Sequence, residues 1–288
     1  MRILIYGTGV IGSLYGALLS RVGHEVWVYA RGKRLESLKQ NGLLYRIRHG
    51  IQRADVRVLD HLDVDDRYDF ILLAVRENQF HQALAELKDN ASPTIVTMVN
   101  SLETHEQWEA ICGNGRVLPA FPGAGGGFDG DVLDAALTPR LIQPTTIGRI
   151  DGKEKVLVRL FRKAGIPCQI VADMHAWQIC HLALVVPLAD AYYEAADPER
   201  AGCDAALMRR TALRIRANLG GLDRRGMRLS PGKLLLFRSL PTWLMGFILG
   251  VIYRSDFGHR FMYRHSMKAP DEMRRLHDAF YGEMERED

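Results

Sequence analysis

The chain has few cysteines and no long hydrophobic run, and both shortages exclude classes of protein. Its cysteines are scattered and form no Cys-x-x-Cys pair; they are Cys112, Cys168, Cys180 and Cys203. We therefore expect no disulfide framework and no metal site, and a reducing, cytoplasmic location. A strand pattern begins at residue 2, so we expect no signal peptide.

The most apolar stretch, residues 240–253, is too short to cross a bilayer. It holds one proline and two glycines within 14 residues, whereas a spanning helix needs about 20 apolar residues. A buried helix is the simplest interpretation. A helix at a membrane surface or in a homodimer interface is the alternative.

Charge of one sign is also scarce, because the net charge is only +4 over 288 residues. The whole chain therefore gives no indication of a nucleic-acid partner. Residues 203–288 carry 16 Lys and Arg against 10 Asp and Glu. This local excess favours a solvated, arginine-rich helix face over a binding site for an anionic partner.

The start of the chain carries a dinucleotide-binding pattern. Residues 2–6 form an apolar strand pattern, and Gly7, Gly9 and Gly12 follow it with Gly-x-Gly-x-x-Gly spacing. The first glycine permits a tight turn, the second lets the backbone approach a pyrophosphate, and the third lets the next helix pack against the sheet. A turn without a ligand is the alternative. The residues that we expect to contact the cofactor here are Gly7, Thr8, Gly9, Val10, Ile11 and Gly12.

Strand and helix patterns alternate over the first 170 residues. Residues 69–75 are almost entirely apolar, as is typical of a strand buried in a parallel sheet. The alternation predicts an α/β fold with a Rossmann-type, doubly wound parallel sheet. Residues 43–59 are predicted to form a hairpin that turns near His49 and Gly50. Further strands are expected at residues 2–6, 25–29, 94–99, 116–120, 141–150 and 166–171.

Residues 121–130 contain the largest glycine cluster of the chain. Such a cluster predicts a loop. The loop would follow a strand at the carboxyl edge of the sheet, where ligands bind in open α/β folds. We therefore expect its backbone to lie against a ligand, and a merely flexible connection is the alternative.

The end of the second predicted strand carries no acidic residue. NAD-binding sites usually place an Asp or Glu about 20 residues beyond the glycines, whereas residues 28–34 contain Arg31, Lys33 and Arg34. A guanidinium can bind a 2′-phosphate through two parallel hydrogen bonds. The pattern favours NADP(H) as cofactor and Arg31 as the residue that binds its phosphate. Ordinary solvated loop charges are the alternative.

Beyond residue 173 the strand patterns end and helical periodicity dominates. We expect an NADP-binding Rossmann-like domain at residues 1–172. A helical domain for substrate binding and dimerisation follows at 173–288, with the substrate in a cleft between the two. The helices are expected at residues 176–195, 204–219, 234–253 and 271–285.

The motifs of the chain resemble, in order, those of the ketopantoate reductase family, which reduces 2-dehydropantoate to pantoate with NADPH. Where the family has Lys-x-x-Gln after an apolar strand, this chain has Arg76 and Gln79. Asn100 keeps the amide of the family's Asn-Gly-x-Gly-x-x-Glu turn. The resemblance implies that Arg76 contacts the adenosine phosphate and that Asn100 lies near the nicotinamide. It also implies a backbone contact near Gly126.

The first helix of the second half resembles the family helix Trp-x-Lys-x-x-x-Asn-x-x-x-Asn-Pro-Leu. Trp177 and Pro187 are kept, but their spacing differs by one residue. Aligned from Pro187, the family's catalytic Lys position holds Gln178. Aligned from Trp177, it holds Ile179. Neither alignment restores a lysine, and a glutamine cannot act as an acid near neutral pH.

The missing lysine leaves the proton donor open. His181 lies one helical turn beyond Gln178, and an ordinary histidine pKa suits proton donation near pH 7. A packed histidine is the alternative. Asp190, Tyr192 and Tyr193 are further candidates on the same helix. The catalytic residues that we expect are His181, Gln178 and Asn100.

The two substrate-binding Asn positions of the family motif hold Leu182 and Val186, which predicts a less polar pocket. We expect an NADPH-dependent reductase of a small carbonyl compound, for which a 2-keto acid is one option. One alternative is a non-catalytic NADP-binding sensor or scaffold. The other is a true 2-dehydropantoate 2-reductase with altered catalytic residues.

Overall fold

The chain folds into two compact units, which a computed structural model describes for residues 1–47 and 50–285. Unit 1 comprises Met1–Met174, and unit 2 begins at His175. The division lies close to the boundary expected at residue 172. Each unit is considered by itself below.

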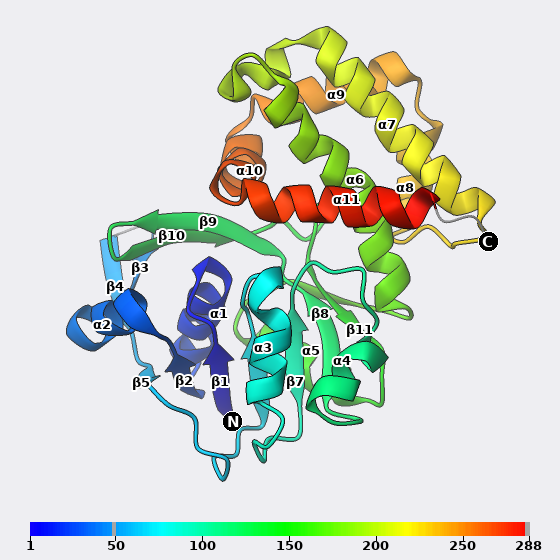
Figure 1. The fold of residues 1–288 in the computed structure, drawn as a ribbon. Coiled ribbons are helices and arrows are strands. Elements are labelled where there is room, and N and C mark those ends of the chain that lie inside the picture. Colours follow the sequence, from blue (N-terminus) through cyan, green and yellow to red (C-terminus); the bar gives the residue numbers. More distant parts are fainter. Residues whose placement is uncertain (48–49, 286–288) are drawn as a thin grey trace. The chain divides into compact units, whose positions relative to one another are not determined.

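Unit 1 is built on an eight-stranded sheet (Figure 1). Neighbouring strands are parallel except at the β8–β11 pair, which is antiparallel. The predicted Rossmann-type sheet is confirmed, with this one reversal near its edge. In spatial order the strands are β12 (Cys168–Val171), β11 (Thr145–Gly148), β8 (Val117–Phe121), β7 (Ile95–Met98), β6 (Phe70–Leu73), β1 (Arg2–Tyr6), β2 (Glu25–Tyr29) and β5 (Arg57–Leu59).

Helices cover both faces of this sheet. Alternate residues of β1 enter two separate cores: Ile3 and Ile5 pack with side chains of α1 and α5, whereas Leu4 packs with side chains of α3 and α4. A strand that is apolar on both faces needs a helical layer on each side, and this is why the strands read as nearly continuous apolar runs. The helices of unit 1 are α1 (Val10–Arg21), α2 (Gly32–Asn41), α3 (Glu77–Glu86), α4 (His105–Cys112) and α5 (Lys153–Lys163).

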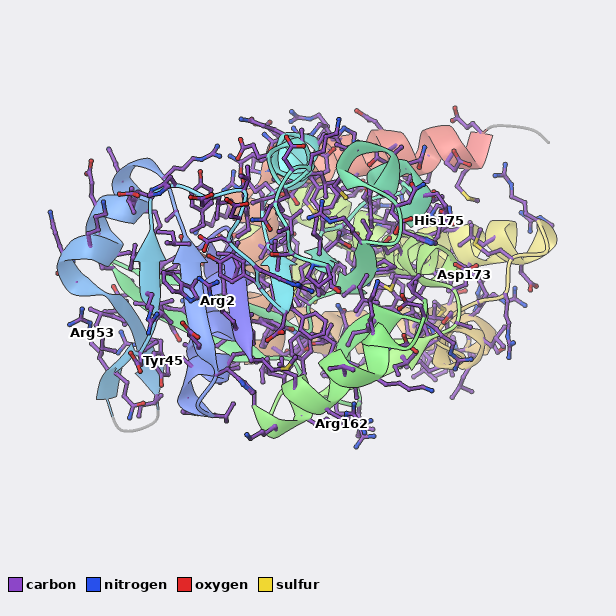
Figure 2. All side chains as sticks on the ribbon, turned by 90° about the horizontal axis from the view of Figure 1, so that it is seen from below. Arg2, Tyr45, Arg53, Arg162, Asp173 and His175 are labelled. Carbon is purple, nitrogen blue, oxygen red and sulfur yellow. The ribbon has the colours of Figure 1, made fainter. Side chains whose placement is uncertain are left out.

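A second sheet of four strands combines two distant parts of unit 1. Its order is β4 (Gly50–Ala54), β3 (Leu43–Ile47), β10 (Val132–Leu137) and β9 (Ala124–Asp129). Figure 2 shows Tyr45 and Arg53 on the neighbouring strands β3 and β4. The hairpin predicted at residues 43–59 is confirmed for β3 and β4, whereas Arg57–Leu59 form β5 and pair with β2 in the large sheet. Of the expected turn, His49 lies outside the described residues and Gly50 begins β4.

The predicted loop at residues 121–130 is wrong. Most of it is strand β9, which pairs antiparallel with β10 over its full length. Gly126 has φ +147°, and a Cβ atom there would lie 2.3 Å from the Asp134 carbonyl oxygen. Gly126 therefore permits close backbone approach within a hairpin, a use of glycine that composition does not distinguish from a loop.

Unit 2 is helical throughout its described residues. Residues 234–253 do not form the single helix that we expected, because the chain bends by 118° between α8 and α9. Leu240 is extended ahead of Pro241, as the proline ring requires. The helices are α6 (Met174–Glu194), α7 (Ala205–Arg224), α8 (Lys233–Ser239), α9 (Thr242–Tyr253), α10 (Arg264–Lys268) and α11 (Pro270–Glu285), with a 3₁₀ turn at Pro198–Cys203 and a π turn at Gly258–Tyr263.

Helix α9 is buried on one side only. Met245, Leu249 and Tyr253 are buried, whereas Trp243, Phe247 and Val251 are 68%, 63% and 47% exposed. The last three residues recur every fourth position and form one stripe along the helix. Across the described residues, no single helix meets the length and hydropathy needed to span a membrane, and only the bent α8–α9 pair does so by composition.

Candidate functional site

The glycine turn between β1 and α1 contains two glycines that the fold itself requires. Gly7 has φ +96°, and a Cβ atom there would lie 2.6 Å from the Ala74 carbonyl oxygen. A Cβ atom on Gly12 would lie 2.0 Å from the Gly7 carbonyl oxygen and 2.8 Å from a methyl carbon of Ile5. Both positions would need backbone movement to accept a side chain, so their glycines are explained without any ligand.

Gly9 differs from the other two. It is exposed, its φ is −69°, and a Cβ atom there would meet nothing within 4 Å. The fold therefore does not require glycine at this position. Gly9 is the N-cap of α1, which has no side-chain cap and no acidic residue in its first turn. An open space at an uncapped helix N-terminus fits a bound pyrophosphate.

Arg31, at the end of β2, takes part in a network of four side chains. Its Nε donates to the Tyr29 hydroxyl at 2.8 Å, and its Nη2 donates to the Tyr6 hydroxyl at 3.2 Å. Nη2 also forms an ion pair with Glu86, the last residue of α3, and the Tyr6 hydroxyl donates to the same carboxylate. The Arg31 side chain is still 53% exposed, so a ligand can reach it.

Arg34 is the basic side chain that lies on the glycine turn itself. Its Nε donates to the Thr8 carbonyl at 3.2 Å, its Nη2 donates to the Ser13 hydroxyl at 3.3 Å, and its guanidinium lies over the Phe128 ring. Burial lowers the pKa of Arg34, which Asp131 partly offsets. The sequence showed Arg34 as a cation three residues beyond Arg31. Its position on the glycine turn became visible only in the folded structure.

The residues carried over from the family motifs occupy separate places in unit 1. Arg76 and Gln79 are exposed at the start of α3. Asn100 follows β7, and its Oδ1 is buried without a hydrogen-bond partner among the described residues. An orphaned buried acceptor fits a site that a polar ligand completes. Gly126 has a structural reason of its own in the β9–β10 pairing, so its contact with a cofactor stays a prediction.

Glu103 fixes the segment that carries Asn100. Its Oε2 accepts hydrogen bonds from Trp108 Nε1 and from His81 Nε2, each at 2.7 Å. Its backbone N–H donates to the Ser101 hydroxyl at 3.1 Å. A small hollow of about 140 Å³ lies here, between the start of α3 and this segment. Glu103 therefore positions this segment, a role that the sequence did not indicate.

The two expected catalytic residues of unit 2 lie on α6, where Gln178 is buried and His181 is half-buried. Gln178 is 1% exposed. The His181 ring stacks on Trp177, with ring centroids 5.1 Å apart. Burial, with a smaller contribution from His265, lowers the pKa of His181 to about 4. The histidine is therefore neutral at pH 7, which does not suit it to donate a proton there. A joint role for His181, Gln178 and Asn100 stays a prediction.

The other acid–base candidates on α6 have packing partners within unit 2. Asp190 Oδ2 lies 3.0 Å from His277 Nδ1. The Tyr193 hydroxyl donates to the Ser266 carbonyl at 2.7 Å, and Tyr192 stacks on Tyr253. Each contact ties α6 to another helical segment, so these side chains are explained by packing. Among the described residues, no three His, Cys, Asp or Glu side chains gather as metal ligands.

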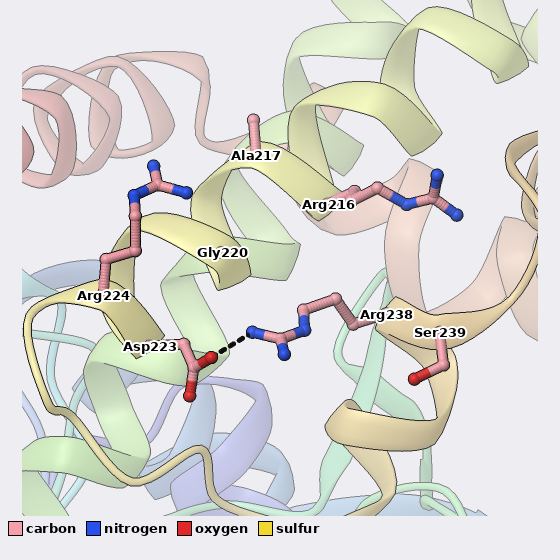
Figure 3. A pocket seen from close by; sticks show the side chains of 7 residues that line it. All are labelled: Arg216, Ala217, Gly220, Asp223, Arg224, Arg238 and Ser239. Atoms are coloured by element: carbon pink, nitrogen blue, oxygen red, sulfur yellow. Dashed lines mark hydrogen bonds and ion pairs between the residues drawn. The ribbon is translucent and has the colours of Figure 1, made fainter.

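A hollow of about 580 Å³ in unit 2 is rich in arginine (Figure 3). Arg238 Nη1 pairs with Asp223 Oδ2 at 2.7 Å, and Arg216 Nη1 donates to the Thr242 hydroxyl at 2.8 Å. Arg224 and Arg238 lie in the last turns of α7 and α8, where cations interact favourably with the helix dipole. The positions of Arg224 and Arg238 are explained by the helix ends, and Arg216 is explained by its hydrogen bond to Thr242. The lining residues are Arg216, Ala217, Gly220, Asp223, Arg224, Arg238 and Ser239.

The lowered pKa of His181 predicts a pH dependence of stability. Below pH 6.5 His181 takes up a proton in the unfolded chain but stays neutral in the folded one. The free energy of unfolding therefore falls as the pH falls from about 6.5 towards 4. Between pH 7 and pH 5 this histidine alone should cost about 2 kcal/mol of unfolding free energy. Urea titrations at both pH values measure it. His181→Gln should remove that part of the dependence, and the matched control His61→Gln should keep it. An unchanged dependence in His181→Gln would contradict the assignment.

Comparison with known proteins agrees with this architecture. A family model described as ketopantoate reductase PanE/ApbA matches residues 3–134. The curated 2-dehydropantoate 2-reductase of Pyrococcus horikoshii is 26% identical over 188 residues, which cover 62% of this chain and 58% of that protein. The match thus spans less than two thirds of that relative's length.

Two solved structures share the fold over nearly the whole chain. The 2-dehydropantoate 2-reductase of Methylococcus capsulatus has a TM-score of 0.63 and 18% identity, and the alignment covers 99% of this chain and 96% of that one. A dimeric ketopantoate reductase from Staphylococcus aureus has a TM-score of 0.64 and 13% identity, with 98% and 100% covered. At these identities the likeness shows the fold alone. The family match is to residues 3–134, so it is this part of the chain that carries the ketopantoate reductase PanE/ApbA family domain.

Proposed function

We propose that the protein is an NADPH-dependent oxidoreductase, similar to ketopantoate reductase, that reduces a small carbonyl compound by hydride transfer. The observation that carries the proposal is Gly9. It is the one glycine of the turn whose missing side chain the fold does not need. A bound pyrophosphate gives it a reason, because its backbone has to approach the phosphates closely.

Two further groups in unit 1 support a bound dinucleotide. Arg31 and Arg34 place two guanidinium groups near the glycine turn and the end of β2. In Rossmann folds, this is where the phosphates and the adenosine ribose bind. The buried, unpartnered Oδ1 of Asn100 supports a polar ligand on the far side of the same sheet edge. A 2′-phosphate would add charge-assisted bonds to the arginines, which is the reason for proposing NADPH.

The proposed chemistry needs a proton as well as a hydride. NADPH supplies the hydride when bound, and the reduced carbonyl oxygen then requires a proton. Gln178 can donate a hydrogen bond to such an oxygen but cannot give up a proton near neutral pH. His181 can serve only if the negative charge that develops on the substrate raises its pKa. We therefore propose His181 as donor and Gln178 as orienting group. Leu182 and Val186, at the two Asn positions of the family motif, are buried in this structure.

The same observations favour one alternative, a non-catalytic NADP-binding sensor or scaffold. A neutral His181 and the absent family lysine both point away from efficient proton transfer. Oxidation of NADPH with a panel of ketones and 2-keto acids, 2-dehydropantoate included, separates the possibilities. Turnover with 2-dehydropantoate alone would favour a true 2-dehydropantoate 2-reductase with altered catalytic residues. Intact binding without turnover would favour the sensor.

Gly9→Val should abolish coenzyme binding while the fold is retained. The Cβ atom of the valine would meet nothing within 4 Å, so the side chain would extend into the open space beside α1, where we place the pyrophosphate. Quenching of intrinsic fluorescence by NADPH measures the loss, which should exceed about 100-fold in Kd, and circular dichroism checks the fold. Gly282→Val, at another exposed glycine with open surroundings, is the matched control. Unchanged NADPH affinity in Gly9→Val would refute the proposed site.

Arg31→Ala should weaken NADPH binding more than NADH binding. The variant loses a charged partner for the 2′-phosphate, which corresponds to about a tenfold or greater rise in the Kd for NADPH. The exposed Arg57→Ala, on the neighbouring strand β5, should leave both affinities unchanged. Equal losses for the two coenzymes in Arg31→Ala would exclude a role in binding the 2′-phosphate.

We also propose a homodimer that covers the exposed stripe of α9. Trp243 and Phe247 expose large apolar side chains, a pattern that marks interaction surfaces. Trp243→Asp should raise the dimer dissociation constant by about tenfold or more, as measured by sedimentation equilibrium. Leu141→Asp, at an exposed leucine of unit 1, is the control. A wild-type protein that stays monomeric at all concentrations would refute the dimer.

A further inference from the structure

The structure supplies the acidic residue that is absent from the end of β2. The sequence offers only cations between Arg31 and Arg34, which favoured a 2′-phosphate. Glu86 comes from a different element, the C-terminal end of α3, and its carboxylate forms an ion pair with Arg31. An acid and a base therefore share the position that usually decides between the two nicotinamide coenzymes.

Two tyrosines hold this pair in place. Tyr6 ends β1 and Tyr29 ends β2, and their ring centroids are 4.9 Å apart. The Tyr29 hydroxyl accepts from Arg31 at 2.8 Å, and the Tyr6 hydroxyl donates to Glu86. Gln82 Nε2 donates to the second carboxylate oxygen of Glu86 at 3.1 Å. The pair is thus held by side chains from β1, β2 and α3 and is not a chance contact between two mobile side chains.

The pair is nevertheless open to a ligand. The Arg31 side chain is 53% exposed and the Glu86 side chain is 29% exposed. Burial raises the pKa of Glu86, but hydrogen bonds from Tyr6 and Arg31 outweigh this effect, and the net pKa lies below its usual value. Glu86 is therefore a carboxylate at neutral pH. It can accept a hydrogen bond from a hydroxyl, and it repels a phosphate.

We propose that Glu86 is a specificity-determining residue that competes with the 2′-phosphate of NADPH for Arg31 and accepts a hydrogen bond from the 2′-hydroxyl of NADH. The inference rests on the coenzyme site proposed above. The 2′-phosphate of NADPH would meet the Glu86 carboxylate at Arg31, repel it and compete with it for the guanidinium. NADH can leave the ion pair intact and add one hydrogen bond to it. The pair therefore makes the preference for NADPH over NADH smaller than Arg31 alone would make it.

Glu86→Gln tests this role because it keeps the shape and the hydrogen-bonding oxygen but removes the charge. The Kd for NADPH should fall by about tenfold and the Kd for NADH should rise severalfold, as measured by fluorescence quenching and by calorimetry. Asp89→Asn, which neutralises an exposed carboxylate just beyond α3, should leave both constants unchanged. In an Arg31→Gln background, Glu86→Gln should tighten NADPH binding less than it does in the wild type, because the competition for Arg31 has been removed and only the repulsion of the phosphate remains.

The outcomes separate this inference from the proposed function. If the wild-type protein binds neither coenzyme, the proposed function fails. If it binds them and Glu86→Gln leaves the ratio of the two Kd values unchanged, or shifts it towards NADH, the role of Glu86 is refuted while the coenzyme site stands. Because the ratio is taken within one variant, a general loss of stability does not affect it.

Discussion

The close approach of α1 to the end of β1 is the constraint on which unit 1 depends. Gly12 packs so near the Gly7 carbonyl oxygen that even one additional carbon atom would overlap it. This contact fixes how closely the helix packs against the strand, and it leaves the uncapped N-terminus of α1 at the glycine turn. Gly9 lies between the two and is the residue that this packing leaves unexplained. A sequence pattern that is usually interpreted as a unit thus separates into two glycines that the packing requires and one that it does not.

Much of the fold of unit 1 was predictable because its signals are local. An apolar strand between two helical layers has little choice but to be apolar along its whole length, and residues 69–75 show this clearly. The glycine cluster at residues 121–130 failed for the opposite reason. Whether Gly126 serves a loop or a tight strand pair depends on the distant Asp134 carbonyl oxygen. The break of the helix at Pro241 could have been predicted from the proline itself, but we gave more weight to the continuous apolar run around it.

The candidate site divides in the same way. The turn of Gly7, Gly9 and Gly12 was predicted from its own residues, whereas the meeting of Arg31 with Glu86 depends on the register of β1, β2 and α3. No spacing rule connects residues so far apart in the chain. The His181 environment was equally inaccessible, because the covering that lowers its pKa is provided by the surrounding fold. The residue type suggested that His181 is a proton donor, whereas its surroundings keep its ring neutral at pH 7.

The four-stranded sheet has a consequence for how this protein can be recombined with its relatives. Its two hairpins come from separate segments, at residues 43–54 and 124–137, and within the described residues they join through the parallel pairing of β3 with β10. Removing one segment alone would leave the inner strand of the other hairpin with an open edge, which invites pairing with another molecule and aggregation. The two segments should therefore be transplanted or deleted together.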